Sequence, residues 1–208
     1  MPFDLFLSAF VSLFVVVDPF GSAAVFAALT QKMDARAQRK IAIKAVLIAA
    51  SLLLAFSLIG EVLLERMGIT LSAFRVAGGL LLFVTAFRMI MSYHDPDQIN
   101  SEKSAYRDRS DIAVFPLAIP LLSGPGTITA IVMFSTSAQG VLERGEVIAA
   151  MLAVQGIALA CLFGAAALGR LFGPTGYGII TRVMGIMLAA MSVQFISDGL
   201  HGLFSVAS

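Results

Sequence analysis

The chain has 208 residues, of which 59% are hydrophobic and 13% charged, and its mean hydropathy is +0.93. This composition indicates a polytopic membrane protein and excludes an ordinary soluble domain. The formal net charge of +1 gives no basis for nucleic-acid binding, and the single Cys161 excludes a disulfide framework or a thiolate metal cluster within one chain.

Apolar segments long enough to cross a bilayer make up most of the sequence. A transmembrane helix needs about 20 predominantly apolar residues. Six segments meet that length, at residues 3–29, 41–64, 71–91, 112–138, 147–168 and 181–204. The first is too long for the core of a cleaved signal peptide, and no Lys or Arg precedes Lys32, so we interpret it as a span. The predicted fold class is an all-α membrane protein with six transmembrane helices, surrounded by the lipid bilayer.

The basic residues predict the orientation of the helices. Eleven of the 14 fall in or beside the connections that follow the first, third and fifth predicted spans. The opposite side holds only Arg66, Arg75 and Arg144. Because cytoplasmic loops are enriched in Lys and Arg, this distribution places the larger set in the cytoplasm and both termini outside, on the periplasmic side.

The first predicted span is interrupted by Asp18, Pro19, Phe20 and Gly21. Proline removes a helical hydrogen bond and clashes with the preceding turn, so two half-helices are predicted to meet near the middle of the bilayer. An ionisable side chain at that depth usually faces a partner or a water-filled cavity. Asp18 could instead act only as the N-cap of the second half-helix, with Pro19 in its first turn. The two roles are compatible, and the carboxylate is a candidate ligand for a substrate amine, a proton or a cation.

The fourth predicted span is interrupted at the corresponding place by Ser123, Gly124, Pro125 and Gly126. The N–H groups at the start of a half-helix attract anions through free donors and the helix dipole. Together with the hydroxyl groups of Ser123, Thr127 and Thr129, they form a candidate site for a substrate carboxylate. The alternative is that the prolines merely kink the helix and that the glycines permit close helix packing.

A polar segment at residues 94–111, predicted to be cytoplasmic, divides the chain into halves at residues 1–93 and 112–208. Pro19 and Pro125 lie 106 residues apart, and Arg75 and Arg182 lie 107 residues apart. This similar spacing predicts an internal repeat. Each half has three spans, so the second copy enters the membrane from the opposite side. The prediction is two inverted three-helix repeats, with helices 1 and 4 broken at mid-membrane, an arrangement that permits alternating access.

Two further patterns concern contacts between helices. Gln155 and Gln194 are expected to form helix-to-helix hydrogen bonds, with substrate contact as the alternative. Gly156, Ala160 and Gly164 form a face of small residues that should let another helix approach closely. Such faces are compatible with a homo-oligomer.

The residues around both interruptions resemble one known family. The run from Val17 to Gly21, together with the run from Ser123 to Ile128, is similar to the MarC family of bacterial and archaeal integral membrane proteins. The resemblance covers essentially the whole chain, with six spans, a polar middle linker and the Asp-Pro and Gly-Pro-Gly motifs in the expected order. It implies a place among small neutral amino-acid transporters related to exporter-type carriers. Some members have been associated by name with antibiotic resistance.

The residues and the resemblance together predict a multi-pass carrier in the bacterial cytoplasmic membrane that moves a small neutral amino acid such as glycine or alanine. We expect coupling to a proton or sodium gradient, with export as a plausible direction. In this hypothesis Asp18 holds the substrate ammonium or the coupling cation, while Gly124, Gly126 and Thr127 offer donors to the substrate carboxylate. The candidate substrate-binding residues are Asp18, Pro19, Gly21, Ser123, Gly124, Pro125, Gly126 and Thr127.

Other functional classes fit the sequence less well. An intramembrane enzyme is not expected, because His94 and His201 are the only histidines, no HExxH motif is present and no second buried acid accompanies Asp18. No metal site and no cofactor are predicted. A passive channel, a transporter for another small solute or drug, and a regulatory membrane subunit without transport activity of its own remain as alternatives.

Overall fold

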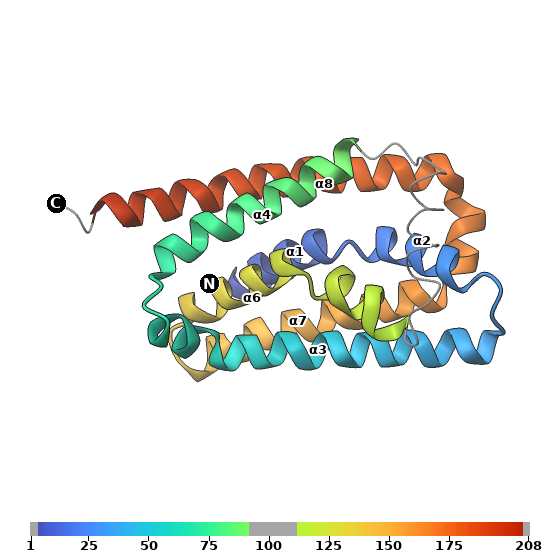
Figure 1. Ribbon diagram of the computed structural model, residues 1–208, viewed down its shortest axis with the longest axis horizontal. Helices are drawn as coiled ribbons and strands as arrows, with labels where there is room; N and C mark the ends of the chain where they lie inside the picture. Colours follow the sequence, from blue (N-terminus) through green and yellow to red (C-terminus); the bar gives the residue numbers. More distant parts are fainter. Residues whose placement is uncertain (1–3, 92–111, 206–208) are drawn as a thin grey trace.

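The structure, a computed structural model, describes residues 4–91 and 112–205, and every regular element in those ranges is helical. The elements are α1 (Asp4–Val17), α2 (Pro19–Thr30), α3 (Ala35–Arg66), α4 (Leu71–Met91), η1 (Ala113–Leu122), α6 (Pro125–Ser137), α7 (Val141–Phe163) and α8 (Ala165–Ser205). The predicted linker at residues 94–111 lies outside the described residues. Most helices run side by side along the long axis of the molecule (Figure 1).

Short polar side chains determine where α3 and α4 begin. The Asp34 carboxylate accepts a 2.7 Å hydrogen bond from the backbone N–H of Ala37 in the first turn of α3. The Thr70 hydroxyl accepts a 3.2 Å hydrogen bond from the N–H of Ala73 in α4. Each bond satisfies a donor that the helix itself leaves unpaired. Between the helices, Gly68 has a φ of 68°, a region that favours glycine, and the chain reverses direction (Figure 1).

Five helical segments among the described residues are long and apolar enough to cross a membrane. They are Asp4–Thr30, Ala35–Arg66, Leu71–Met91, Val141–Phe163 and Gly178–Ser205. A sixth forms if Ala113–Leu122 and Pro125–Ser137, which are bent by 53° relative to each other, make one span. The prediction of an all-helical membrane protein is confirmed, with five or six candidate spans in the described ranges. The inverted arrangement of the halves and the depth of the interruptions in a bilayer stay predictions.

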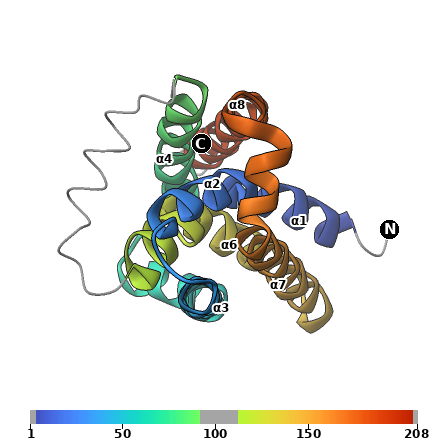
Figure 2. The same ribbon diagram turned by 90° about the vertical axis from the view of Figure 1, so that its right-hand side faces the viewer.

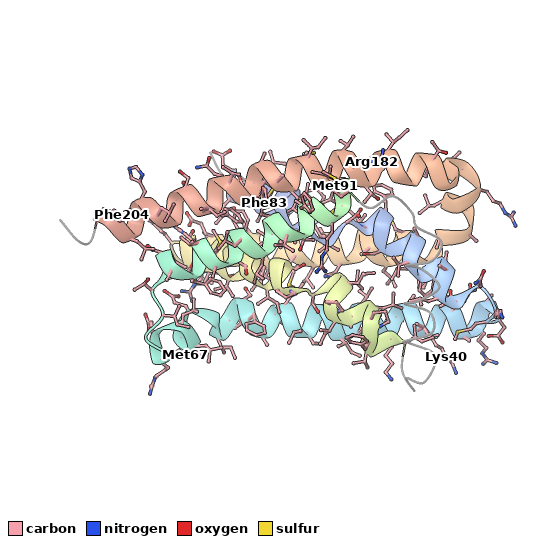
Figure 3. All side chains as sticks on the ribbon, turned by 45° about the horizontal axis from the view of Figure 1, so that its top comes forward. Lys40, Met67, Phe83, Met91, Arg182 and Phe204 are labelled. Atoms are coloured by element: carbon pink, nitrogen blue, oxygen red, sulfur yellow. The ribbon has the colours of Figure 1, made fainter. Side chains whose placement is uncertain are left out.

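The two ends of the bundle differ in charge. The connection from α2 to α3 and the junction of α7 with α8 share one end, on the right in Figure 1, and α4 runs toward that end. Lys40 lies at this end, whereas Met67 and Phe204 lie at the other (Figure 3). Most basic residues within the described ranges belong to the first end, because they occur after α2, in the first turns of α3, late in α4 and early in α8. α1 begins and α8 ends at the opposite end (Figure 1).

Basic residues at the opposite end contact neighbouring helices. The Arg144 guanidinium in α7 lies 3.3 Å from the Glu61 carboxylate in α3. Arg75 in α4 donates a 3.4 Å hydrogen bond to the hydroxyl of Ser137, the last residue of α6. The first contact joins the outer helices α3 and α7, and the second joins α4 with the interrupted η1–α6 segment.

The interrupted helices occupy the middle of the molecule. α4 packs along α8, and α3 contacts α7. The α1–α2 and η1–α6 segments lie between these two pairs (Figure 2). α1 and α2 pack against α7, whereas η1 and α6 pack against α3. Both interruptions are therefore surrounded by helices from both halves of the chain.

Apolar side chains fill the interior and also cover the outside. Leu13, Leu122 and Ile131 are 1% exposed or less. On the outer helices Leu47 and Ile186 are each 61% exposed. Such an extensive exposed apolar surface marks a membrane-facing protein rather than a water-soluble one.

Close packing of α4 on α8 depends on glycines in both helices. A Cβ atom added at Gly79 would lie 2.9 Å from the carbonyl oxygen of Ser192 and 2.7 Å from Cγ1 of Ile196, both in α8. One added at Gly199 would lie 2.8 Å from the carbonyl oxygen of Ser72 in α4. Because lipid solvates apolar side chains well, helices in membranes associate largely through such close backbone approach.

The small-residue face of α7 makes no comparable contact within the chain. A Cβ atom at Gly156 would meet no atom within 4 Å, and both Gly156 and Ala160 are exposed. The expectation that another helix packs closely on this face is wrong for the described part of the chain, because the neighbours of α7 contact its other side. A homo-oligomer stays a prediction.

Replacing Gly79 by Ala should destabilise the protein, because the added methyl group meets the α8 backbone. Overpacking of this kind costs about 1–3 kcal/mol. The matched control is Gly156→Ala, where space is open and Ala favours the helix by roughly 0.5–1 kcal/mol over Gly. Thermal unfolding in detergent, followed by circular dichroism, should give a lower midpoint for Gly79→Ala than for the wild type and no decrease for Gly156→Ala. Equal midpoints for the two variants would contradict this account of the α4–α8 contact.

Candidate functional site

The first interruption consists of a single residue. α1 ends at Val17, α2 begins at Pro19, and Asp18 between them has left-handed backbone angles of φ 43° and ψ 72°. Among residues other than glycine, Asp and Asn tolerate this region best, because their short side chains can form local hydrogen bonds. The Asp18 carboxylate does so, accepting a 3.0 Å hydrogen bond from the N–H of Gly21. Asp18 is thus the N-cap of α2, as the narrower interpretation of the sequence proposed.

Gly21 belongs to the same structural unit as Asp18. A Cβ atom added at Gly21 would lie 2.1 Å from Oδ2 of Asp18. Only glycine therefore leaves room for the carboxylate in its observed position. Polar contacts continue across the interruption, since the N–H of Ser22 donates to the carbonyl of Asp18 at 2.9 Å and its hydroxyl donates to the carbonyl of Val17 at 3.1 Å. The departure from helical geometry is confined to one residue, and Asp4–Thr30 remains one continuous apolar segment.

The second interruption is wider and more sharply bent. Phe115 and Ile119 have extended backbone angles within η1, each directly before a proline, because proline disfavours the α conformation in the residue that precedes it. The helix then ends at Leu122. Ser123 turns back on it, since its N–H and its hydroxyl donate to the carbonyl of Ala118 at 2.9 and 2.8 Å.

The start of α6 differs from the start of α2. Its N-cap is Gly124, which has no side chain to accept a hydrogen bond from the first turn. Thr127 in that turn is 2% exposed, and Gly126 is also buried. The start of α6 therefore has no side-chain cap, and its first residue Pro125 is exposed whereas Gly124, Gly126 and Thr127 are buried. Its N–H groups carry the partial positive charge of the helix dipole.

The two interruptions face each other across one close contact. A Cβ atom added at Gly126 would lie 3.5 Å from Cγ1 of Val16, two residues before Asp18, and 2.6 Å from Cδ2 of Leu82 in α4. The structure thus forms two groups of the predicted site residues. The first is Asp18, Pro19 and Gly21, and the second is Ser123, Gly124, Pro125, Gly126 and Thr127. The first turn of α6 packs against the last turn of α1, so the groups lie on neighbouring segments.

Gln155 is a residue of this region that the sequence alone did not assign to the site. Its side chain, 2% exposed, reaches from α7 to the second interruption, where Nε2 donates a 3.4 Å hydrogen bond to the carbonyl of Leu122. This bond confirms the expected helix-to-helix contact. Its other amide atom, Oε1, is buried and has no hydrogen-bond partner. A glutamine within an apolar segment was the available signal, but the sequence could not indicate which helix it would face.

Gln194 behaves differently from Gln155. It is exposed on α8, and its Nε2 donates a 2.7 Å hydrogen bond to the carboxylate of Asp198 in the same helix. The expectation of a helix-to-helix bond is wrong for Gln194, because an acceptor four residues further along the helix lies on the same face.

The chemistry available at the interruptions is polar and asymmetric. The first provides a carboxylate, and the second provides backbone donors together with the amide oxygen of Gln155. Within residues 4–91 and 112–205, no group of three or more His, Cys, Asp or Glu side chains is arranged to hold a metal ion. These groups are suited to binding a small solute that carries both a positive and a negative charge.

Comparison with known proteins assigns the chain to a family. The sequence profile described as MarC family integral membrane protein matches residues 3–204. The chain belongs to the MarC family. The family resemblance stated from the two interruptions is therefore confirmed, and the protein is a multi-pass integral membrane protein.

Relatives of this MarC-family chain occur in archaea and bacteria. A UPF0056 membrane protein of Methanocaldococcus jannaschii is 37% identical over 202 residues, covering 97% of this chain and 98% of the relative. The UPF0056 membrane proteins YvbG of Bacillus subtilis and YhcE of Escherichia coli are each 34% identical, covering 99% and 97% of this chain and 99% and 94% of their own lengths. Their names state a membrane location and no substrate. No solved structure matches the chain.

Removing the Asp18 side chain should destabilise the protein more than removing an ordinary cap. Asp18→Ala loses the bond to Gly21 and places Ala in the left-handed region, which together cost roughly 2 kcal/mol. The matched control Asp34→Ala loses a similar cap at a residue with extended angles, for about 1 kcal/mol. Asp18→Asn keeps an acceptor and tolerates the backbone angles, so its unfolding midpoint in detergent should stay near the wild-type value. An Asp18→Asn variant as unstable as Asp18→Ala would show that the charge, rather than the cap, stabilises the interruption.

Proposed function

We propose that this MarC-family protein is a carrier for small neutral amino acids of the glycine and alanine type. The observation that carries the proposal is the start of α6, which has no side-chain cap and where Gly124, Gly126 and Thr127 are buried. Unpaired N–H groups inside an apolar protein are costly, and a carboxylate is the anion that best satisfies several converging donors. In this proposal Gly124, Gly126 and Thr127 form the cradle. The side chain of Leu82 and the carbonyl of Pro120, which lie where Cβ atoms of Gly126 and Gly124 would be, move aside when the carboxylate binds.

The Asp18 carboxylate is the second element of the proposed site. It caps α2, and it also places an ionisable carboxyl group on the segment that contacts the start of α6. In this proposal it attracts either the ammonium group of the amino acid or the coupling proton or sodium ion. An ionisable group inside an apolar helix bundle usually marks the pathway of a substrate or an ion.

The contacts between helices support an inverted repeat, which the proposed mechanism requires. If α1–α2, α3 and α4 correspond to η1–α6, α7 and α8, then exchanging the halves leaves the main contacts in place. The contact of α1 and α2 with α7 corresponds to that of η1 and α6 with α3, and the contact of α4 with α6 corresponds to that of α8 with α2. Under this correspondence α4 is equivalent to α8 and α3 is equivalent to α7, and the two helices of each pair contact each other. The two interrupted segments also run in opposite directions (Figure 1). Rocking of one such half against the other alternately exposes a central site.

We further propose that the protein acts in the bacterial cytoplasmic membrane as an exporter, with its basic end in the cytoplasm and both termini outside. A pocket of about 340 Å³ at the basic end, between α2, α3 and α7, is lined by Phe26, Gln38, Arg39 and Phe163 among others. The Arg39 guanidinium lies over the Phe163 ring, 5.5 Å from its centroid. Since α2 runs from Asp18 toward this pocket, the pocket is a suitable entrance for a cytoplasmic substrate. No enzymatic step is part of the proposal.

Counterflow in proteoliposomes tests the transport activity. Vesicles loaded with unlabelled glycine or alanine should accumulate labelled amino acid transiently and saturably, and an imposed proton or sodium gradient should accelerate net uptake. Gly126→Val should reduce exchange at least about tenfold, because the larger side chain displaces Val16 and Leu82 and closes the cradle. The matched control Gly156→Val points into open space and should exchange at nearly the wild-type rate.

Asp18→Asn separates the two roles proposed for the carboxylate. If Asp18 holds the coupling ion, the variant keeps exchange but loses its response to the ion gradient. If Asp18 holds the substrate ammonium, the half-saturating glycine concentration rises about tenfold or more. A folded variant with wild-type rates and an unchanged pH profile would remove the carboxylate from the mechanism. Absence of amino-acid flux in the folded wild type would instead favour another solute or a regulatory role, and flux without accumulation against a gradient would indicate a channel.

Site-directed labelling tests the proposed orientation. In a Cys161→Ser background, Gln139→Cys places a thiol between α6 and α7, and Gln31→Cys places one between α2 and α3, both at exposed positions. A membrane-impermeant maleimide added to intact bacteria should label Gln139→Cys at once and Gln31→Cys only after permeabilisation. The reverse pattern would invert the topology.

A further inference from the structure

Gln155 holds an acceptor that nothing else in the described chain satisfies. Its Nε2 is occupied by the carbonyl of Leu122, while Oε1 is buried and has no partner. Buried polar atoms of this kind are uncommon in native proteins, and each requires a physical explanation. The explanation must supply a donor, because an amide oxygen can only accept hydrogen bonds.

Rotation of the amide does not solve the problem, and the hydroxyl groups of Ser123 and Thr129 at the second interruption are already engaged. Exchanging Oε1 and Nε2 of Gln155 would set the amide oxygen against the carbonyl of Leu122, so that two acceptors face each other. The hydroxyl of Ser123 already donates to the carbonyl of Ala118 at 2.8 Å, and that of Thr129 donates to the carbonyl of Pro125 at 2.9 Å. A donor for Gln155 must therefore come from outside these groups.

The place of Gln155 in the fold identifies the chemistry of that donor. Leu122, which holds its amide, immediately precedes the second interruption, where the start of α6 presents donors without a side-chain cap. One interruption thus offers donors suited to a carboxylate and an acceptor suited to an N–H group. A simple anion would leave the acceptor unsatisfied, and a simple cation would be repelled by the helix N-terminus. A zwitterion satisfies both.

We propose that Gln155 is a substrate-binding residue, whose Oε1 accepts a hydrogen bond from the α-ammonium group of a bound amino acid while the start of α6 binds the carboxylate. This inference rests on the proposed function and deepens it, because it makes the ammonium group a requirement for recognition. It also leaves the Asp18 carboxylate available for the coupling ion. Gln155 thereby discriminates an amino acid from a carboxylic acid of the same shape.

Glycine and propionate provide the test, because propionate carries a methyl group where glycine carries its ammonium group. Inhibition of labelled alanine counterflow by each compound measures its apparent affinity. The wild type should bind glycine at least tenfold more tightly than propionate. Gln155→Met keeps the side-chain volume but removes the acceptor, so it should weaken glycine about tenfold and leave propionate nearly unchanged. The ratio of the two affinities should therefore fall toward one.

Two further variants keep the result interpretable. Gln194→Met, on the exposed face of α8, is the matched control and should keep the wild-type ratio. If Gln155→Met does not fold, Gln155→Leu, which also lacks the acceptor, replaces it and should likewise lose discrimination in favour of glycine. A purely structural role for Gln155 would lower stability and weaken both compounds equally.

The outcomes separate this inference from the proposed function. One outcome is that the wild type exchanges glycine and that Gln155→Met, or Gln155→Leu in its place, keeps the wild-type ratio of glycine to propionate affinity. This outcome would overturn the role of Gln155 and leave the carrier proposal in place. No exchange of any amino acid by folded wild-type protein would overturn both. A reduced ratio in the variant, with the Gln194→Met control unchanged, would support both.

Discussion

The need to satisfy backbone hydrogen bonds away from water governs this structure. In an apolar environment a helix pairs its own N–H and C=O groups, so any departure from helical geometry must be compensated locally. At Asp18 the compensation is nearly complete, because the carboxylate caps α2 and the side chain and N–H of Ser22 contact carbonyls on either side of the turn. At the second interruption Ser123 compensates only the end of η1, and the start of α6 receives no side-chain cap.

This difference gives the two interruptions unlike chemistry. One contributes a carboxylate held by its own backbone, and the other contributes helix-terminal donors beside the amide of Gln155. Their contact through Val16 and Gly126 places these groups on adjoining segments in the middle of the bundle. In the proposed function a solute with charges of both signs would occupy this arrangement, because each charge would meet a complementary group without requiring a buried ion pair between side chains.

The surrounding helices explain how such a site can be both rigid and mobile. α4 and α8 approach closely at glycines, where the helix backbones limit any change in spacing. The interrupted segments lie between this pair and the α3–α7 pair, so each contacts helices from the opposite half of the chain (Figure 2). A movement of one half relative to the other would therefore change the surroundings of both interruptions together, which is the coupling that an alternating-access carrier needs.

Composition and local chemistry determined much of this protein in advance. Long apolar segments required membrane helices, and the Asp-Pro and Gly-Pro-Gly motifs located both interruptions, because proline and glycine act on the backbone of their own neighbourhood. The capping role of Asp18 was also foreseeable, since it depends on residues three positions apart. Three features were not foreseeable: the direction in which Gln155 points, the exposure of Gly156, and the contact of Gly126 with Val16. Each depends on which helix lies opposite, and that is decided only when helices distant in sequence pack together, because a helical sequence specifies its faces but not their neighbours.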